Sequence, residues 1–431
     1  MLKYYLWNIG CQMNKAESER FSARLESLGY GPVPAPNDAD LVLLNTCVVR
    51  GNAEEKVRGE ISYLKGIKSR RPQMAIAVTG CFVESEPEKM RERFPHVDLF
   101  FPAGEFEIFE EWMSGKAPAL NSSILFRGPG TVAPAVQVPI IRGCNNFCSY
   151  CIVPFRRGRE RSRVPVEIAA EVQALVERGA KEVTLLGQNV NSYGRDLEDV
   201  TGLSGLLSEI NGIPGLERIR FLTSHPRDVD RQFALALSYL TKVCEWINLP
   251  VQAGDDRVLQ AMRRGYTVEH YRNLVGELRS SVPGIAISTD VIVGFPGETD
   301  IEFTHTMDLL SEMRFDTVHV ATYSPRPGTL AALTMPDDIP AEEKSRRLQA
   351  VEALQEGIAS ELNQGLIGRT LEVMVERRSK GKWEGRTRTN RLVFVNEDAD
   401  LIRQLVKVEI TSASPWSLQG KMALKTEVAA R

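Results

Sequence analysis

The 431-residue sequence lacks the features that mark secreted and membrane proteins. Its first residues, Met1–Asn8, show neither a basic n-region nor an apolar h-region, so no secretory signal is expected. No apolar run reaches the roughly 20 residues that a membrane-spanning helix needs. We therefore expect a cytoplasmic protein without a membrane partner. Seven cysteines in such a chain favour metal binding or redox chemistry over a disulfide framework, because disulfides persist in oxidising compartments.

A strong net charge is also missing. The formal net charge of −3 would by itself argue against a nucleic-acid partner. The charge is uneven, however, because Arg369–Arg391 holds eight Arg or Lys against three Glu, a local balance of +5. A second basic cluster spans Arg156–Arg163. Such local fields attract phosphates even on a slightly acidic chain.

The spacing of apolar segments predicts an α/β protein with three structured parts. Residues 1–102 alternate strands and helices, which calls for a parallel sheet with helical crossovers. Residues 103–135 are rich in Gly and Pro and indicate a linker. Residues 136–366 repeat the alternation six times, which suggests a partial TIM-type (β/α)6 barrel with its chemistry at the carboxyl ends of the strands. Residues 367–431 hold short β-type runs that predict a small β-barrel.

The expected strands can be placed from these patterns. In the first part they are Tyr4–Ile9, Asp40–Val48, Met74–Thr79 and Val97–Phe101. In the central part they are Val136–Arg142, Glu182–Leu186, Arg218–Leu222, Val243–Leu249, Ala286–Val293 and Thr317–Tyr323. In the last part they are Leu371–Glu376, Leu392–Val395 and Val406–Thr411.

Three cysteines stand within eight residues, in Cys144-Asn-Asn-Phe-Cys148-Ser-Tyr-Cys151. Thiols this close cannot all lie on one helix face, so they must sit on a loop wrapped around a ligand. Soft thiolates favour zinc or an iron–sulfur cluster over hard cations. A structural zinc site usually takes four ligands, and no fourth Cys or His is nearby in the sequence. Three thiolates can hold a cubane cluster and leave one iron open, but the spacing alone leaves the choice between zinc and cluster open.

Three more cysteines, Cys11, Cys47 and Cys81, lie at or just beyond the carboxyl ends of expected strands. Ligands of open parallel sheets bind outside those strand ends, so adjacent loops would bring the three thiols together. A free cysteine is also commonly a small buried residue that caps a strand. Three such placements in successive βα units favour a second three-thiolate site. The seventh cysteine, Cys244, lies in an apolar strand pattern and is expected in the core.

The surroundings of both cysteine sets resemble a known family. Cys-x3-Cys-x2-Cys after a strand, with Tyr150 before the last cysteine, is similar to the signature of the radical S-adenosylmethionine (SAM) superfamily. Gly10-Cys11-Gln-Met-Asn14, Asn45-Thr-Cys47 and Thr79-Gly-Cys81 resemble the N-terminal domain of the methylthiotransferases. The resemblance implies two 4Fe-4S clusters as cofactors beside SAM. Cys144, Cys148 and Cys151 would hold the cluster that cleaves SAM, and Cys11, Cys47 and Cys81 an auxiliary cluster that presents the inserted sulfur.

Segments that follow the later central strands resemble superfamily segments that contact SAM. The resemblance implies SAM contacts from Gly187, Gln188, Asn189, Ser224, Gln252, Gly294 and Pro296. Position alone would make the first of these segments a polar turn and the last a plain βα loop. We expect His225 to be a structural hydrogen-bond partner. The family often has His where this sequence has Asn248, which leaves the role of Asn248 open.

The basic clusters suggest an RNA partner. Small β-barrels with basic faces often bind RNA, and Gly385-Arg-Thr-Arg-Thr-Asn-Arg391 resembles the loop of a TRAM domain. The resemblance implies RNA contacts from Arg386, Arg388 and Arg391. The run beside the first cysteine loop adds Arg157 and Arg159, although this run could also support the SAM-binding loop or be a solvated charged face. The alternative is an ordinary charged surface on a structural β-module.

Within the methylthiotransferases, the Gly-Cys-Gln-Met-Asn, Leu-Gly-Gln-Asn-Val-Asn and Arg-Gly-Arg-Glu-Arg-Ser-Arg segments look most like the tRNA-modifying branch. This implies insertion of a methylthio group at C2 of N6-isopentenyladenosine at position 37, in the anticodon loop of tRNA. We expect a monomer that also meets an electron donor and a sulfur donor. The alternatives are an aspartate methylthiotransferase of a ribosomal protein, with the same six cysteines, and a zinc-stabilised RNA-binding protein without catalysis.

Overall fold

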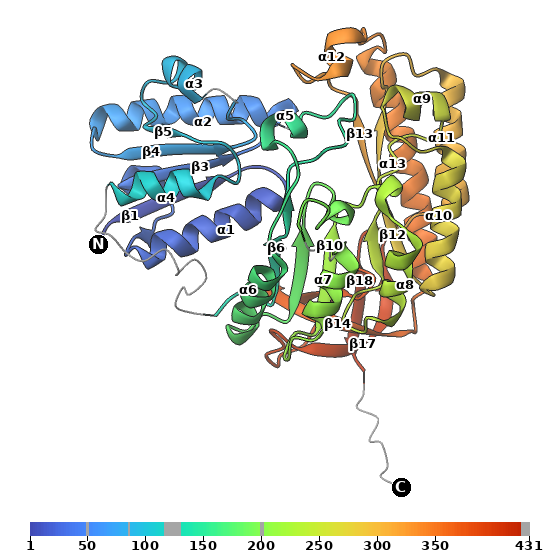
Figure 1. Cartoon of the computed structure of the whole chain (residues 1–431). Coiled ribbons are helices and arrows are strands. Elements are labelled where there is room, and N and C mark those ends of the chain that lie inside the picture. Colours follow the sequence, from blue (N-terminus) through green and yellow to red (C-terminus); the bar gives the residue numbers. More distant parts are fainter. Residues whose placement is uncertain (49–50, 85–86, 116–130, 199–201, 424–431) are drawn as a thin grey trace.

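The computed structural model describes residues 1–48, 51–84, 87–115, 131–198 and 202–423. Figure 1 shows an N-terminal α/β domain beside a central half-open barrel, with a small β-barrel packed beneath the central part. None of the helices in these ranges combines the length and the apolar character that crossing a membrane requires.

The N-terminal domain is a parallel sheet in the order β2-β1-β3-β4-β5, as the alternation predicts. Its strands are β1 (Lys3–Asn8), β2 (Gly31–Pro32), β3 (Leu41–Thr46), β4 (Ala75–Gly80) and β5 (Leu99–Phe100). Its helices are α1 (Gln12–Ser27), α2 (Gly51–Arg70), α3 (Pro87–Arg93) and α4 (Phe106–Ser114), with a 3-10 turn, η1 (Pro36–Asp38). Every residue of β3 and β4 is buried, because helices cover both faces of a parallel sheet. Only β2 was not expected, since a Gly-Pro pair has no strand pattern.

The central domain holds six parallel strands in two half-sheets, β10-β9-β6 and β11-β12-β13. A parallel bridge between Ile219 and Val243 joins the halves into the expected partial barrel. The strands are β6 (Ala135–Pro139), β9 (Glu182–Leu186), β10 (Arg218–Leu222), β11 (Trp246–Asn248), β12 (Ala286–Val293) and β13 (Thr317–Thr322). The helices outside them are α6 (Pro165–Glu177), α7 (Gly202–Asn211), α8 (Arg231–Tyr239), α9 (Asp256–Ala261), α10 (Val268–Ser281), α11 (Asp300–Met313) and α13 (Ala341–Gln364). Short helices α5 (Val153–Arg157), α12 (Leu330–Thr334), η3 (Val190–Ser192) and η4 (Pro226–Asp228) follow strand ends or loops.

One expected strand is broken. The pattern predicted a single strand over Val136–Arg142, but β6 ends at Pro139, which has no N–H to donate to a sheet ladder. The chain then forms a separate strand, β7 (Ile141–Arg142), which pairs antiparallel with β8 (Arg161–Ser162). This hairpin closes the loop that carries Cys144, Cys148 and Cys151.

The C-terminal domain is a closed barrel in the order β14-β15-β16-β18-β17. Its strands are β14 (Thr370–Ser379), β15 (Lys382–Thr387), β16 (Leu392–Val395), β17 (Leu405–Ala413) and β18 (Leu418–Met422). Val373, Trp383, Val393, Val408 and Leu418 are among the side chains that fill its core. The strands β15 and β18 were missed by sequence reasoning because their outward positions carry charged and polar side chains, which hide the short apolar pattern.

The small barrel packs against the amino ends of the central strands. Arg218, the first residue of β10, is fully buried and donates to the carbonyl oxygens of Arg386 and Glu372. Arg220 donates to the carbonyl oxygens of Thr387 and Arg388. The carboxyl ends of the central strands, where TIM-type barrels hold their sites, therefore lie at the other end of the domain (Figure 1).

Candidate functional site: two sets of three cysteines

Cys11, Cys47 and Cys81 follow three adjacent parallel strands, β1, β3 and β4. The Cys11 thiol donates to Asn14 Oδ1 over 3.2 Å, and Asn14 Nδ2 donates to the carbonyl oxygen of Thr46, next to Cys47, over 2.8 Å. The Cys81 amide donates to the same carbonyl over 2.9 Å. The loops of the three strands thus meet through one buried asparagine and one backbone oxygen.

Gly80 explains why a glycine precedes Cys81. Its φ is +98°, and a Cβ built there would lie 2.1 Å from the Thr46 carbonyl oxygen. Only glycine combines that backbone conformation with so close an approach. The end of β4 therefore presses directly onto the end of β3, which holds Cys81 beside Cys47.

Cys144, Cys148 and Cys151 lie on the loop between β7 and α5. The loop folds back on itself, since the Cys144 amide donates to the Gly158 carbonyl over 3.2 Å. Gly143, at φ +76°, again allows a close contact, with a Cβ position 2.1 Å from the Arg159 carbonyl oxygen. Hydrogen bonds from Asn145 to the Glu160 carboxylate, 3.1 and 3.2 Å long, lock the two arms of the loop together.

Burial makes these thiols poor acids in the protein alone. It raises the pKa of Cys144 to about 11 and that of Cys151 to about 12, and it also raises the pKa of the Cys81 thiol. Metal ligation requires the thiolate, so binding a cluster releases protons that burial otherwise holds. A nearby positive charge stabilises the thiolate and so reduces the free-energy cost of removing the proton.

Each cysteine set has one such charge, a buried arginine. Arg264 donates through Nη1 to Cys148 Sγ over 3.3 Å, through Nη2 to the Pro250 carbonyl over 3.0 Å, and through Nε to the Tyr266 hydroxyl over 3.0 Å. Arg157 donates through Nε to Cys81 Sγ over 3.3 Å. Burial by itself would lower the pKa of both guanidinium groups. Tyr150, Tyr266 and Cys148 raise the pKa of Arg264, and Cys81 and Glu17 raise that of Arg157, so that both pKa values lie above the usual one and both groups remain charged.

Arg157 has a different role from the one the sequence suggested. We expected an RNA contact, but its side chain is 3% exposed and forms an ion pair of 2.7 Å with Glu17. Its Nη2 also donates to Asn14 Oδ1 over 3.1 Å. No phosphate can reach a group enclosed in this way. Arg157 instead links the helix that follows Cys151 to the set of Cys11, Cys47 and Cys81.

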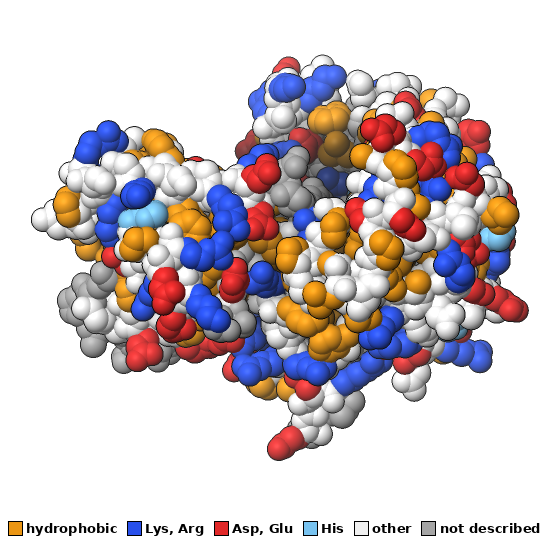
Figure 2. Space-filling model, turned by 90° about the horizontal axis from the view of Figure 1, so that it is seen from above, with side chains coloured by type: hydrophobic (Ala, Val, Ile, Leu, Met, Phe, Trp, Pro, Cys, Tyr) orange, Lys and Arg blue, Asp and Glu red, His pale blue; other side chains and the backbone are white. Residues whose placement is uncertain are grey.

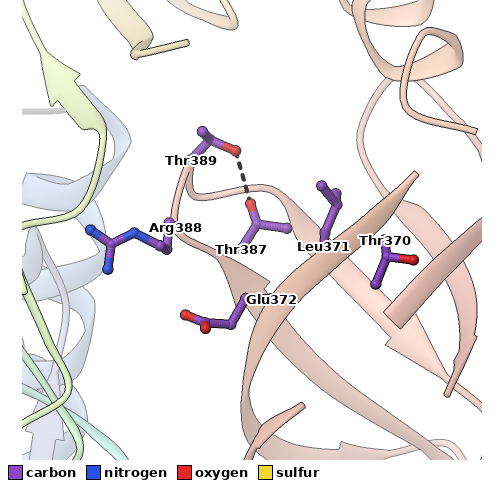
Figure 3. A pocket seen from close by; sticks show the side chains of 6 residues that line it. All are labelled: Thr370, Leu371, Glu372, Thr387, Arg388 and Thr389. Atoms are coloured by element: carbon purple, nitrogen blue, oxygen red, sulfur yellow. Dashed lines mark hydrogen bonds between the residues drawn. The ribbon is translucent and has the colours of Figure 1, made fainter. Parts of the chain in front are cut away.

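The arginines of the C-terminal barrel for which RNA contacts were predicted also have partners inside the protein. Arg388 donates to the Glu245 carboxylate, with a closest contact of 2.7 Å, and Figure 3 shows its side chain extending away from the Thr387–Thr389 turn. Arg391 pairs with Asp316 over 2.6 Å. Arg386 donates to the Asn390 carbonyl over 3.1 Å. Arg388 and Arg391 thus hold the barrel against the central domain, whereas Arg386 binds its own loop and keeps a side chain that is 38% exposed. Arg159, beside the first cysteine loop, is exposed.

The carboxyl end of the central barrel carries buried polar atoms that have no hydrogen-bond partner among the described residues. They come from four strand ends and are Asn189 Oδ1, Ser224 Oγ, His225 Nε2, Gln252 Oε1 and the Tyr323 hydroxyl. Orphaned buried polar atoms are costly unless a ligand satisfies them. Thr223 and Gln252 also have positive φ values, +70° and +75°, and strain of this kind clusters at ligand sites. This end of the barrel fits a polar ligand such as SAM.

The other residues for which SAM contacts were predicted also make contacts within the protein. Gln188 Oε1 accepts from the Gly143 amide over 2.7 Å and ties the cysteine loop to the end of β9. Gly187 packs against Ile141, and Pro296 is buried beside Phe295. The Gly294 amide donates to Glu298 over 2.6 Å, and Lys344 packs where a Cβ would lie. This close packing explains why position 294 requires glycine.

Three residues near the orphaned atoms were not predicted to contact SAM, although His225 was expected to be a structural hydrogen-bond partner and the role of Asn248 was left open. His225 lies among them, and burial beside the Arg264 charge lowers its pKa to about 3, so the imidazole is neutral at physiological pH. Asn248 Nδ2 donates to Asp290 Oδ2 over 2.8 Å. Arg264 sits in a turn after α9 with no motif around it, so no sequence signal could have pointed to it.

The donor sets suit iron–sulfur clusters. No three His, Cys, Asp or Glu side chains in the described ranges are grouped as ligands of one metal ion. In a cluster each thiolate binds its own iron, so the thiols need not converge on a single point. Seen from above, the surface is hollowed beside the junction of the two α/β domains, with charged side chains of both signs around the hollow (Figure 2).

Comparison with known proteins agrees with the domain structure. The Radical SAM superfamily model matches residues 138–310, the model described as Uncharacterized protein family UPF0004 matches residues 3–102, and the TRAM domain model matches residues 364–423. Among solved structures, the radical SAM methyltransferase TsrM from Kitasatospora setae has a similar fold, with a TM-score of 0.55 and 16% identity over 77% of this chain and 74% of that one.

Relatives match over nearly the whole chain. The tRNA-2-methylthio-N(6)-dimethylallyladenosine synthase of Dehalococcoides mccartyi is 48% identical over 97% of this chain and 98% of its own length. The protein of the same name from Moorella thermoacetica is 46% identical over 96% of both chains. These matches confirm the resemblance to the methylthiotransferases and the predicted enzyme class and cofactors. The chain therefore belongs to the family of tRNA-2-methylthio-N(6)-dimethylallyladenosine synthases, within the radical SAM superfamily.

Proposed function

We propose that this chain inserts a methylthio group at C2 of N6-isopentenyladenosine at position 37, in the anticodon loop of tRNA. The observation that carries the proposal is the pair of three-cysteine sets, each with a buried arginine on one sulfur and joined to each other through Arg157. The names of the relatives support the tRNA substrate. We infer domain boundaries at residues 1–102, 103–135, 136–366 and 367–431, where the helix α4 of the connecting segment 103–135 packs on the core of the N-terminal domain.

The reaction would be divided between the two cysteine sets. Cys144, Cys148 and Cys151 would hold one 4Fe-4S cluster, and Cys11, Cys47 and Cys81 the other. When bound, the clusters supply the electron that splits SAM and a site for the sulfur to be transferred, because an aromatic C–H is too weakly acidic for side-chain bases. The protein's own task is to position the reactants and exclude water.

The surroundings of the loops are suited to that task. Asn189, Ser224 and Gln252 offer the buried polar atoms that would orient SAM beside the first loop. Cys144 and Cys148 are at most 9% exposed, which shields this site from solvent. Cys11 is exposed, whereas Cys47 and Cys81 are buried, so the second site opens to solvent at Cys11. A target adenosine unstacked from its loop would enter on that side.

The proposal is tested by loss and return of one nucleoside. Cells that lack the protein should lose 2-methylthio-N6-isopentenyladenosine from their tRNA by mass spectrometry, and the wild-type gene should restore it. Cys148→Ala and Cys81→Ala should each fail to restore it, while Cys244→Ala, in the central core, should succeed. Persistence of the nucleoside in the deletion strain would refute the proposal, and loss of a methylthio aspartate from a ribosomal protein would assign the alternative substrate.

Metal analysis tests the two cysteine sets separately. After anaerobic reconstitution, the wild-type protein should contain about eight irons, and each of the variants Cys148→Ala and Cys81→Ala about four, because each set would hold a separate 4Fe-4S cluster. Zinc without sulfide would remove the enzymatic interpretation altogether.

A further inference from the structure

A pair of aromatic rings, one half-buried and one exposed, lies on the first cysteine loop and the helix that follows it. Phe147 stands between Cys144 and Cys148, and Phe155 is on α5, directly after the loop. Their ring centroids are 6.0 Å apart and the rings are perpendicular. The Phe155 side chain is 49% exposed, so one face of its ring is open to solvent.

The outward direction of Phe155 follows from the burial of Arg157. The two residues are two positions apart on the same short helix, so their side chains lie on nearly opposite faces. Arg157 is held inward by Glu17 and by Cys81 Sγ. The same contact that joins the two cysteine sets therefore fixes Phe155 at the surface next to them.

Positive charge accompanies the rings. The Arg159 guanidinium lies 4.3 Å from the centroid of the Phe147 ring, within the range of a cation–π contact. Arg159 and Arg161 are exposed, and neither pairs with an acidic group that the structure describes. Arg159 is thus a predicted RNA contact that faces solvent beside two aromatic rings.

The backbone around Phe147 is unusual as well. Its φ is +48°, a left-handed conformation that costs a bulky residue energy. The loop is nevertheless held in place, because Asn145 bonds to Glu160 and the Arg227 guanidinium donates to Asn146 Oδ1. A strained aromatic residue on a rigid loop is a preorganised surface rather than a packing element.

We propose that Phe147, Phe155 and Arg159 form a stacking platform for a nucleobase that flanks the target adenosine. The inference rests on the proposed tRNA substrate and adds a named contact for it. An adenosine that enters between the two cysteine sets must leave its stack, which exposes the faces of its neighbours. Exposed aromatic rings with an adjacent arginine are the usual receptor for such bases, and Arg161 adds charge for the phosphates.

The test uses the reconstituted protein and an anticodon stem-loop RNA with 2-aminopurine beside the target adenosine, whose fluorescence falls when it stacks. Phe155→Ala should weaken binding about 5- to 100-fold and restore the fluorescence, the range expected for the loss of one stacked base. Phe155→Trp should keep both affinity and quenching. Tyr239→Ala, which removes an aromatic ring that is 63% exposed on α8, is the matched control and should change neither.

The outcomes are separable. Iron content and the thermal midpoint should match the wild type in every variant, since Phe155 is at the surface. Wild-type affinity and quenching in Phe155→Ala would overturn the platform while leaving the tRNA substrate intact, and slower reduction of that variant by an electron-donor protein would assign the rings to that partner. A wild-type protein that neither binds nor quenches the stem-loop would refute the proposed function and the platform with it.

Discussion

Replacing Arg157 by Met should disturb the second cysteine set more than any surface change. The substitution removes the guanidinium that pairs with Glu17 over 2.7 Å and contacts Cys81 Sγ over 3.3 Å. The Glu17 side chain is 6% exposed, so its carboxylate would remain buried without a partner. Breaking a buried ion pair from one side costs about 3–5 kcal/mol.

That cost predicts a local opening that is easy to measure. An energy of about 3–5 kcal/mol corresponds to a two- to four-order increase in the opening equilibrium of the segments around Glu17. Hydrogen–deuterium exchange of residues 1–102 should show this increase, while exchange in the C-terminal barrel stays unchanged. The reconstituted variant should also lose iron from the second set, because the charge beside its thiolates is gone.

A double variant tests the reasoning. Arg157→Met combined with Glu17→Gln removes the stranded charge, so it should recover most of the lost protection, although not the contact with Cys81. Replacing both partners of a buried pair is often close to neutral, in contrast to replacing one. If Arg157→Met alone exchanged like the wild type, or if the double variant were worse than the single one, the ion pair would not stabilise this junction.

The other predictions concern pH, backbone geometry and domain docking. Burial lowers the pKa of His225 in the folded protein to about 3, so below about pH 6.5 the unfolded chain binds a proton that the folded chain does not. The free energy of unfolding, measured in urea, should therefore fall by about 1.4 kcal/mol between pH 8 and pH 5.5. The variant His225→Asn should lack this part of the pH dependence. Gly80→Ala should abolish iron binding by the second set, because a Cβ would meet backbone 2.1 Å away, whereas Gly59→Ala, a helical position with open space, should leave the iron content unchanged. Arg218→Met should detach the C-terminal barrel from the central domain, because the Arg386 carbonyl and the Glu372 carboxylate lose a buried hydrogen-bond donor. Limited proteolysis should then cleave rapidly after residue 366. Arg377→Met, at an exposed side chain, is the control and should resist cleavage like the wild type.

Local sequence patterns were enough to predict the architecture. Continuous apolar runs such as Leu41–Leu44 predict buried parallel strands, because both faces of such a strand are covered. Cysteines that follow strands must meet at one edge of a parallel sheet, so the positions of Cys11, Cys47 and Cys81 at that edge follow from periodicity alone. Three thiols within eight residues likewise require a loop. These inferences depend on neighbours in sequence or on the topology of a parallel sheet.

The directions of the arginines could be decided only by the tertiary structure. Arg157 and Arg159 are two residues apart in one basic run, yet one is buried against Glu17 and the other lies over Phe147 at the surface. Arg264 has no motif at all and still reaches Cys148 Sγ. A guanidinium on a long, flexible side chain takes its partner from whichever carboxylate, thiol or carbonyl the fold brings near. Cys81 lies 76 positions and Glu17 140 positions from Arg157, and Cys148 lies 116 positions from Arg264. Local sequence sets where the cysteines lie, whereas long-range packing sets the charge around them.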